Sequence, residues 1–135
     1  MARQLDLLKG PRQRGTKAPA ASEFAIHCMV ADTLDRWITR GWRYSHIPSG
    51  EAREPVTGAR LKRMGLKPGL FDLLLIDPNG RHYWLELKRK ANTMSSSQLE
   101  WAAFFNITGV PHATAVGYQQ AIDQLKLWGA VRASL

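Results

Sequence analysis

The chain of 135 residues has room for one domain around a single hydrophobic core. Its 19 lysines and arginines exceed its 11 acidic residues and give a net charge of +8, which favours a polyanionic partner such as nucleic acid. One cysteine, Cys28, excludes an internal disulfide and a zinc cluster of cysteines, and no segment approaches the roughly 20 apolar residues of a membrane span.

Residues 1–20 are predicted to form a basic, flexible N-terminal arm, and residues 21–135 the folded domain. The arm carries five cations against one acid, Asp6, and its glycines and prolines interrupt any periodicity. Two interpretations fit this composition. The arm follows a phosphate backbone, or it is a solvated tail.

The first helix is predicted over residues 20–40, with Ser22 as its cap and Gly41 at its end. Its apolar residues recur at steps of three and four positions: Ile26, Val30, Leu34, Trp37 and Ile38. Glu23 falls in the first turn, and its spacing from the apolar residues points it toward the sheet. It compensates the helix dipole, or it belongs to a metal site.

A strand is predicted over residues 42–47, followed by a polar connection over residues 48–67. The connection contains a short helix that starts after Thr57 and stops at Gly65. Its cations outnumber its acids, and four of them lie closest to the next strand: Arg60, Lys62, Arg63 and Lys67. Such a cluster forms either a solvated face or a contact with the substrate.

Residues 70–76 and 81–88 are predicted to be two strands joined by the turn 77–80. Pro78 presets the second position of the turn, and Gly80 is free to adopt a left-handed conformation. This pattern favours a type I turn that closes into a glycine bulge, with residues 78–80 as the loop. The loop length fixes which residues face each other across the hairpin.

With this loop, Asp72 lies directly across from Glu86, and Lys88 lies on the same face as Glu86. At about 5 Å and an effective dielectric constant of about 20, the two carboxylates repel by roughly 3 kcal/mol. A divalent cation between them makes the interaction favourable, and oxygen ligands suit Mg²⁺ or Mn²⁺. The alternative is that Asp72 is a polar residue at a strand start and that Glu86 and Lys88 form a surface ion pair.

The remaining segments are predicted to be a helix from Ser95 to Gly109, a strand over 111–117 and a final helix over 118–128. Ser95 and Gln98 have the spacing of a capping box, so Gln98 serves the cap, reaches the site, or does both. The histidines show no pair at metal-ligand spacing and are interpreted as packing or surface residues: His27, His46, His82 and His112.

The resulting order, α-β-(short α)-β-β-α-β-α, with an aspartate on one strand and E-x-K on the next, resembles that of the PD-(D/E)XK nucleases. Among these nucleases, the chain resembles the VRR-NUC family more closely. Four segments carry this resemblance: GLKPGLFDLLL, WLELKRK, SSSQLEW and TGVPHATAVGYQQAIDQL. The resemblance implies an α/β, restriction-endonuclease-like core, in which helices flank a central mixed sheet of four strands. One position departs from the family pattern, since Phe71 stands where proline is usual.

By this resemblance, the chain is a metal-dependent DNA endonuclease that is structure-selective, like Holliday-junction resolvases, and pairs as a homodimer. Asp72, Glu86 and the backbone carbonyl of Leu87 would bind Mg²⁺ or Mn²⁺, and Lys88 would orient or deprotonate the attacking water. The other expected site residues are Glu23, as the acid of the first helix and a further metal ligand, and Gln98.

The expected DNA contacts are Arg60, Lys62, Arg63, Lys67, Arg89 and Lys90. Branched and duplex DNA both remain candidate substrates. No membrane partner is expected, and the expected location is the cytoplasm of a bacterial cell or of a phage-infected host. The alternative function is a basic DNA-binding module on a nuclease-like fold without catalysis.

Overall fold

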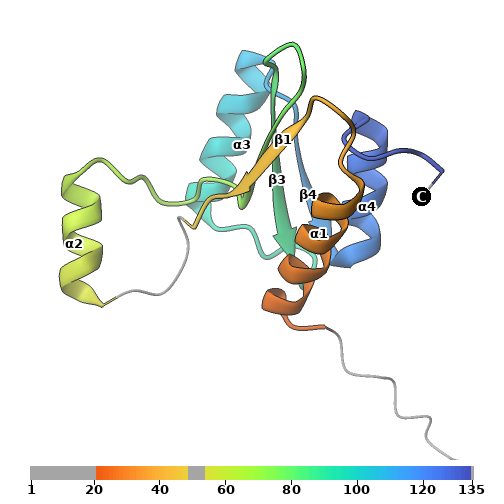
Figure 1. Cartoon of the computed structure of the whole chain (residues 1–135). Coiled ribbons are helices and arrows are strands. Elements are labelled where there is room, and N and C mark those ends of the chain that lie inside the picture. The colour runs from red at the N-terminus through yellow and green to blue at the C-terminus, as the bar shows by residue number, and fades with distance from the viewer. Residues whose placement is uncertain (1–20, 49–53, 135) are drawn as a thin grey trace, which may run out of the picture.

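A computed structural model describes residues 21–48 and 54–134. The predicted arm, residues 1–20, lies outside this part of the chain. Eight helices and strands follow one another in the predicted order (Figure 1): α1 Glu23–Trp37, β1 Arg43–His46, α2 Pro55–Arg63, β2 Leu73–Ile76, β3 His82–Lys88, α3 Ser96–Thr108, β4 His112–Val116 and α4 Gly117–Trp128.

The four strands form one mixed sheet in the order β1-β2-β3-β4. The β1–β2 and β2–β3 pairs are antiparallel, whereas β3 and β4 are parallel. Helices α1 and α4 cover one face of the sheet and α3 covers the other (Figure 1). The predicted fold class, a mixed sheet of four strands flanked by helices, is confirmed. No helix in the described ranges is long and apolar enough to cross a bilayer.

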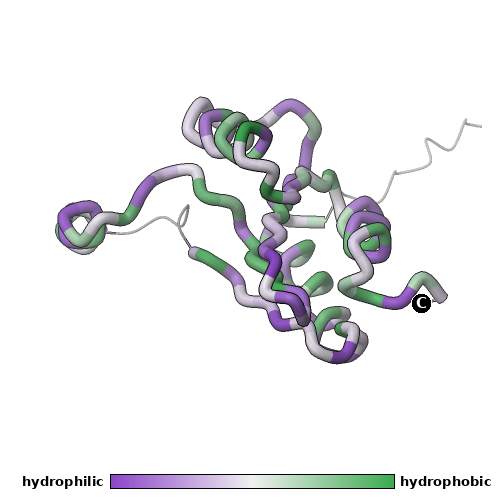
Figure 2. Tube along the Cα trace, turned by 90° about the horizontal axis from the view of Figure 1, so that it is seen from above, coloured by the Kyte–Doolittle hydropathy of each residue, from purple (hydrophilic) through white to green (hydrophobic). Residues whose placement is uncertain are grey.

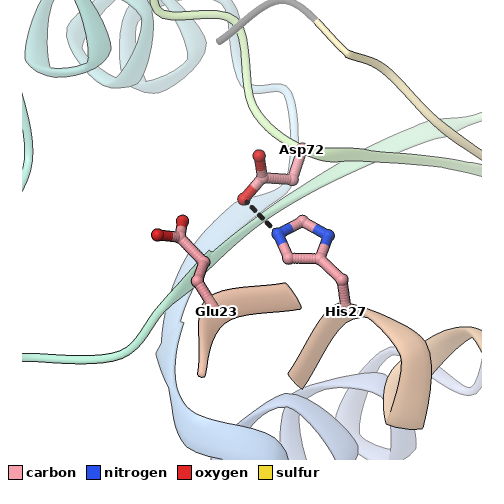
Figure 3. Close-up of side chains that lie close together, drawn as sticks. All are labelled: Glu23, His27 and Asp72. Atoms are coloured by element: carbon pink, nitrogen blue, oxygen red, sulfur yellow. Dashed lines mark ion pairs between the residues drawn. The ribbon is translucent and has the colours of Figure 1, made fainter. Parts of the chain in front are cut away.

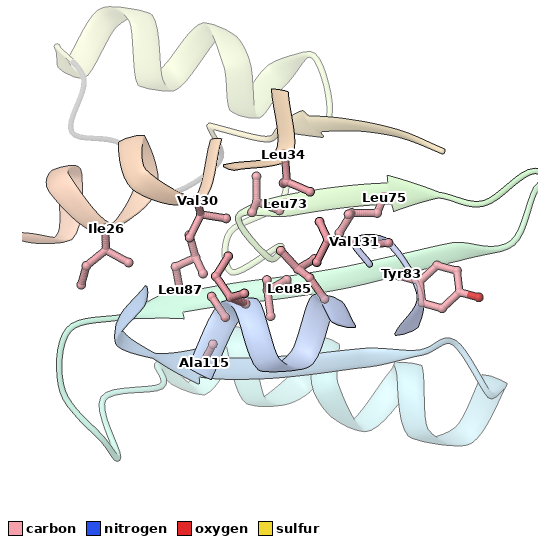
Figure 4. Close-up of a cluster of buried hydrophobic side chains, with 14 residues drawn as sticks. Ile26, Val30, Leu34, Leu73, Leu75, Tyr83, Leu85, Leu87, Ala115 and Val131 are labelled. Atoms are coloured by element: carbon pink, nitrogen blue, oxygen red, sulfur yellow. The ribbon is translucent and has the colours of Figure 1, made fainter. Parts of the chain in front are cut away.

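The main core lies between the sheet and the α1–α4 pair, because the odd-numbered residues of β2 and β3 point toward these helices (Figure 4). Leu75, Leu85 and Leu87 are fully buried there, against Leu34 of α1 and Leu125 of α4. In Figure 2 the hydrophobic strand segments, coloured green, lie between the helices, and α2 lies apart from them at one side of the molecule. None of the residues of α2 is buried, so this helix adds little to the core.

The β2–β3 turn has the predicted geometry. Gly80 N–H donates to the Asp77 carbonyl over 3.0 Å, and Asp77 N–H donates to the Arg81 carbonyl over 3.0 Å. Gly80 has φ +82°, the left-handed conformation that the glycine bulge requires. Leu73 therefore pairs with Leu85. The predicted loop and register are confirmed, and with them the face on which the site residues lie.

The predicted end of the first helix is wrong. Helix α1 ends at Trp37, and Ile38 turns out of the helix with ψ 136° to pair with Val131. The next residue, Thr39, donates its N–H to the Ala130 carbonyl over 2.8 Å. This contact with the chain after α4 competes with another helical turn, and the local sequence carried no sign of it. Gly41 adopts a positive φ of +89° beyond the helix, where it approaches Pro78.

The short helix α2 also begins earlier than predicted, at Pro55 rather than after Thr57. Proline is common at the first position of a helix, because that position needs no N–H donor and the ring presets φ. Its end agrees with the prediction, since Gly65 follows with φ +105°.

Candidate functional site

A pocket of about 480 Å³ opens where the first turn of α1, the start of β2, the end of β3 and the first turn of α3 meet. All five side chains that the sequence predicts for catalysis line it: Glu23, Asp72, Glu86, Lys88 and Gln98. The other lining residues are Phe24, His27, His46, Ile47 and Pro48. The register of the hairpin brings Asp72, which directly precedes β2, together with Glu86 and Lys88 of β3, and the first turns of α1 and α3 add one residue each.

Asp72 and Glu86 are linked through the backbone of both strands. Asp72 N–H donates to Glu86 Oε2 over 3.2 Å, and Leu87 N–H donates to Asp72 Oδ2 over 2.9 Å. Glu86 is the buried charged residue of the described chain, with 2% of its surface exposed. Burial and the negative charge of Asp72 raise the pKa of Glu86 to about 8, even though the positive charge of Lys88 opposes both.

Gln98 joins the cap of α3 to this pair. Its Oε1 accepts from Ser95 N–H over 2.9 Å, which completes the predicted capping box, and also from Lys88 Nζ over 3.0 Å. Its Nε2 donates to Glu86 Oε1 over 2.7 Å. Lys88 Nζ lies 3.4 Å from the same glutamate oxygen. Gln98 therefore takes part both in the cap of α3 and in the site, as the sequence allowed.

The segment before Asp72 is fixed by packing against α3. Phe71 occupies the position where the family that this chain resembles usually has proline. It is 1% exposed and packs edge-on against Phe105, with ring centroids 5.5 Å apart. Two residues earlier, Gly69 has φ +82°, and a Cβ built on it would lie 2.5 Å from the carbonyl carbon of Ser97. The strand entry and the first turn of α3 therefore hold Asp72 and Gln98 in a fixed relation.

Replacing Gly69 by alanine should destabilise the protein more than the same change at Gly80. Both glycines have φ +82°, which costs alanine about 1–2 kcal/mol, but nothing lies within 4 Å of a Cβ at Gly80. The collision with Ser97 should add about 1–3 kcal/mol to the loss at Gly69, measured as the free energy of unfolding in urea. Equal losses of unfolding free energy in the two variants would show that α3 shifts to accommodate the added Cβ at no measurable cost.

The interpretation of all four histidines as packing or surface residues misses two residues of the pocket. His27 Nε2 lies 3.5 Å from Asp72 Oδ2, and His46 Nδ1 lies 3.0 Å from the Asp72 carbonyl. The two rings meet edge-on, with centroids 5.2 Å apart. A sequence signal for His27 existed, because it follows Glu23 by four residues and so lies on the same face of the helix. His46 had none, because the β1–β2 pairing could not be read from the long connection.

Among the described residues, one group of three histidine or acidic side chains lies close enough together to bind a single ion: Glu23, His27 and Asp72. Their ligand atoms lie within 4.8 Å of one another. In Figure 3, Glu23 and His27 come from α1 and Asp72 comes from the chain just before β2. Glu86 supplies a further carboxylate to the same pocket. This oxygen-rich donor set fits a divalent cation of the Mg²⁺ or Mn²⁺ type.

The likeness to known proteins lies in the fold. One solved structure, described as a VRR_NUC domain protein, is 22% identical over 82% of this chain and 89% of its own, with a TM-score of 0.66. A second, described as a VRR_NUC domain, is 20% identical over 78% of this chain and 95% of its own, with a TM-score of 0.53. This chain has the VRR_NUC fold. No protein-family model matches it, and no curated protein matches it significantly.

The predicted DNA contacts lie on the surface of this VRR_NUC fold, outside the lining of the pocket. Arg60, Lys62 and Arg63 occupy the last turn of α2, Lys67 follows that helix, and Arg89 and Lys90 follow β3, all of them exposed. Their contact with DNA stays a prediction, as do the metal-binding role of the Leu87 carbonyl and the catalytic roles of the pocket residues.

Proposed function

We propose that this chain is a metal-dependent DNA endonuclease of the VRR-NUC family. The observation that carries the proposal is the arrangement around Glu86, a buried carboxylate beside Asp72 in an open pocket, with Lys88 3.4 Å away. A fold under selection for stability alone gains more from an apolar side chain there, since burying a carboxylate near a second one is costly. The raised pKa of Glu86 is the sign of that cost.

Asp72, Glu86, the backbone carbonyl of Leu87 and Glu23 are the residues proposed to hold Mg²⁺ or Mn²⁺. When bound, such a cation lowers the pKa of a water molecule and neutralises charge on the scissile phosphate. One or two ions are compatible with this set. The protein's own part is to fix the carboxylates, through the Asp72 and Leu87 N–H groups, before the substrate arrives.

Lys88 is proposed to act on the phosphate and on the attacking water. Its ammonium group is held by Gln98 Oε1 at the wall of the pocket, where it can stabilise the charge that develops on the phosphate or help to deprotonate the water. Gln98 is a positioning residue, because it contacts Glu86 and Lys88 and is itself held by the cap of α3.

DNA is the proposed substrate, with the exposed cations of α2 and of the segment after β3 as its contacts. The net charge of +8 supports this assignment. Selectivity for branched DNA, of the kind that Holliday-junction resolvases show, is also proposed, together with a homodimer. Two copies would present two pockets to opposed strands. Both proposals rest on the resemblance, as does the cytoplasmic location.

The test is cleavage of end-labelled DNA by the full chain with Mg²⁺ or Mn²⁺. A panel of a four-way junction, a flap, a nicked duplex and a plain duplex should give products with either ion and none with EDTA, and the junction should be cut fastest. Equal rates on all four substrates would remove the structure selectivity and leave the nuclease. Binding of DNA with no product on any substrate would favour the alternative function, a basic DNA-binding module without catalysis.

A further inference from the structure

His27 lines the pocket but has no role in the proposed mechanism. It comes from α1, where it lies one helical turn after Glu23, and its ring points toward Asp72 (Figure 3). Its Nε2 lies 3.5 Å from Asp72 Oδ2. The three side chains together present one imidazole nitrogen and two carboxylates to the same space.

The scaffold fixes the helical backbone that carries two of these donors, Glu23 and His27. Ser22 caps α1 by accepting from Ala25 N–H over 3.1 Å, so the first turn, which carries Glu23, is fixed. Ile26 and Val30, on the adjoining face of α1, are buried against the sheet and anchor the helix. The ring of His46 packs edge-on against the His27 ring and restricts its orientation.

The spacing suits an ion. Metal–ligand bonds of about 2.1 Å place two ligand atoms on opposite sides of an ion about 4.2 Å apart. The ligand atoms of Glu23, His27 and Asp72 all lie within 4.8 Å of one another, so closure onto an ion requires shifts of only about half an ångström. Rotations of side chains that are exposed or half-buried supply such shifts.

We propose that His27 is a metal ligand and that Glu23, His27 and Asp72 form a second metal position, which prefers Mn²⁺ to Mg²⁺. The inference rests on the proposed function, since Asp72 then serves both this position and the one beside Glu86. Mg²⁺ takes oxygen ligands and loses its water reluctantly, whereas imidazole nitrogen is a good ligand for transition-metal ions. A nitrogen donor therefore shifts the preference of the site toward manganese.

The test is Mn²⁺ and Mg²⁺ binding to the full chain without DNA, by calorimetry, together with electron paramagnetic resonance of bound Mn²⁺. The wild-type protein should show hyperfine coupling to a directly bound nitrogen. His27→Gln should lose that coupling and bind Mn²⁺ at least ~10-fold more weakly, since loss of outer-shell partners alone costs about 10–100-fold. Mg²⁺ affinity should change by less than about threefold, because its position is made of oxygen ligands.

Two histidine variants serve as controls. His46→Gln removes the neighbouring imidazole of the pocket, and His82→Gln removes an exposed imidazole at the start of β3, away from it. Both should keep the nitrogen coupling. His82→Gln should also keep the Mn²⁺ affinity, whereas His46→Gln, which loses the ring that orients His27, should bind Mn²⁺ less tightly. Loss of the coupling in His46→Gln but not in His27→Gln would overturn the assignment and show that His46 is the ligand instead.

The outcomes separate this inference from the proposed function. If the wild-type protein cleaves DNA but its bound Mn²⁺ shows no nitrogen coupling, His27 is not a ligand and the nuclease assignment stands. The same holds if His27→Gln binds Mn²⁺ as tightly as the wild type. If the wild-type protein neither binds a divalent ion nor cleaves DNA, both proposals fail.

Discussion

Glu86→Ala and Lys88→Ala should each lower metal-dependent DNA cleavage by about 10³-fold or more, while DNA affinity changes by less than about threefold. Glu86 is proposed to hold the ion, and Lys88 to act on the phosphate and the water. Neither side chain is on the exposed basic surface, since Glu86 is 2% exposed and the Lys88 side chain is 13% exposed. Single-turnover cleavage and a binding titration with EDTA separate the two effects.

Two surface variants are matched controls for this pair. Glu100→Ala removes an exposed carboxylate of α3, and Lys90→Ala removes an exposed ammonium group two residues beyond Lys88. Glu100→Ala should leave cleavage unchanged, and Lys90→Ala should weaken binding without stopping the reaction. Cleavage at the wild-type rate in both Glu86→Ala and Lys88→Ala would remove the nuclease assignment in favour of the binding module.

The hairpin shows why the centre of the site could be predicted from the sequence. The turn after Asp77 is specified locally, because its carboxylate accepts from Asn79 N–H over 2.8 Å and from Arg81 N–H over 3.0 Å, and a glycine follows where φ must be positive. Once the loop length is known, the alternation of side chains places Asp72 and Glu86 without further information. Gln98 could be found in the same way, because a capping box is a local pattern.

The parts that the sequence did not predict depend on contacts between distant segments. Helix α1 stops at Trp37 because Ile38 pairs with Val131, which lies beyond the last helix. His46 enters the pocket because β1 pairs with β2, with His46 opposite Leu73. The long connection between these strands does not fix that register as a tight turn does. His27 is an intermediate case, since the helical spacing from Glu23 was visible but gave no reason to expect Asp72 as its partner.

The metal-free protein should become less stable as the pH rises from about 5 to about 8, because of Glu86. Burial and the charge of Asp72 raise the pKa of this carboxyl to about 8 in the folded chain, against 4.5 as its ordinary value. Between these two pKa values the unfolded chain has lost the proton and the folded chain keeps it. The unfolded state therefore binds fewer protons, and the free energy of unfolding falls with rising pH by at most ~1.4 kcal/mol per pH unit.

The effect of this one group is isolated by comparison with Glu86→Leu, which removes the titration and fills a similar volume. The difference in the free energy of unfolding, variant minus wild type, should grow from pH 5 to pH 8 in EDTA, measured by urea titration at each pH. Saturating Mg²⁺ should stabilise the wild-type protein most at pH 8, because the ion binds the ionised carboxylate, and should stabilise Glu86→Leu less.

Glu100→Leu, on the exposed surface of α3, controls for the loss of a carboxylate that does not line the pocket. A difference between Glu86→Leu and wild type that is constant from pH 5 to pH 8 would show that Glu86 is already ionised in the metal-free fold. The contacts with Lys88 and Gln98 alone would then offset the free-energy cost of burying the ionised carboxylate. The free-energy cost of burying this carboxylate would then give no reason to infer that it is kept for an ion, even if the ligands themselves were correct.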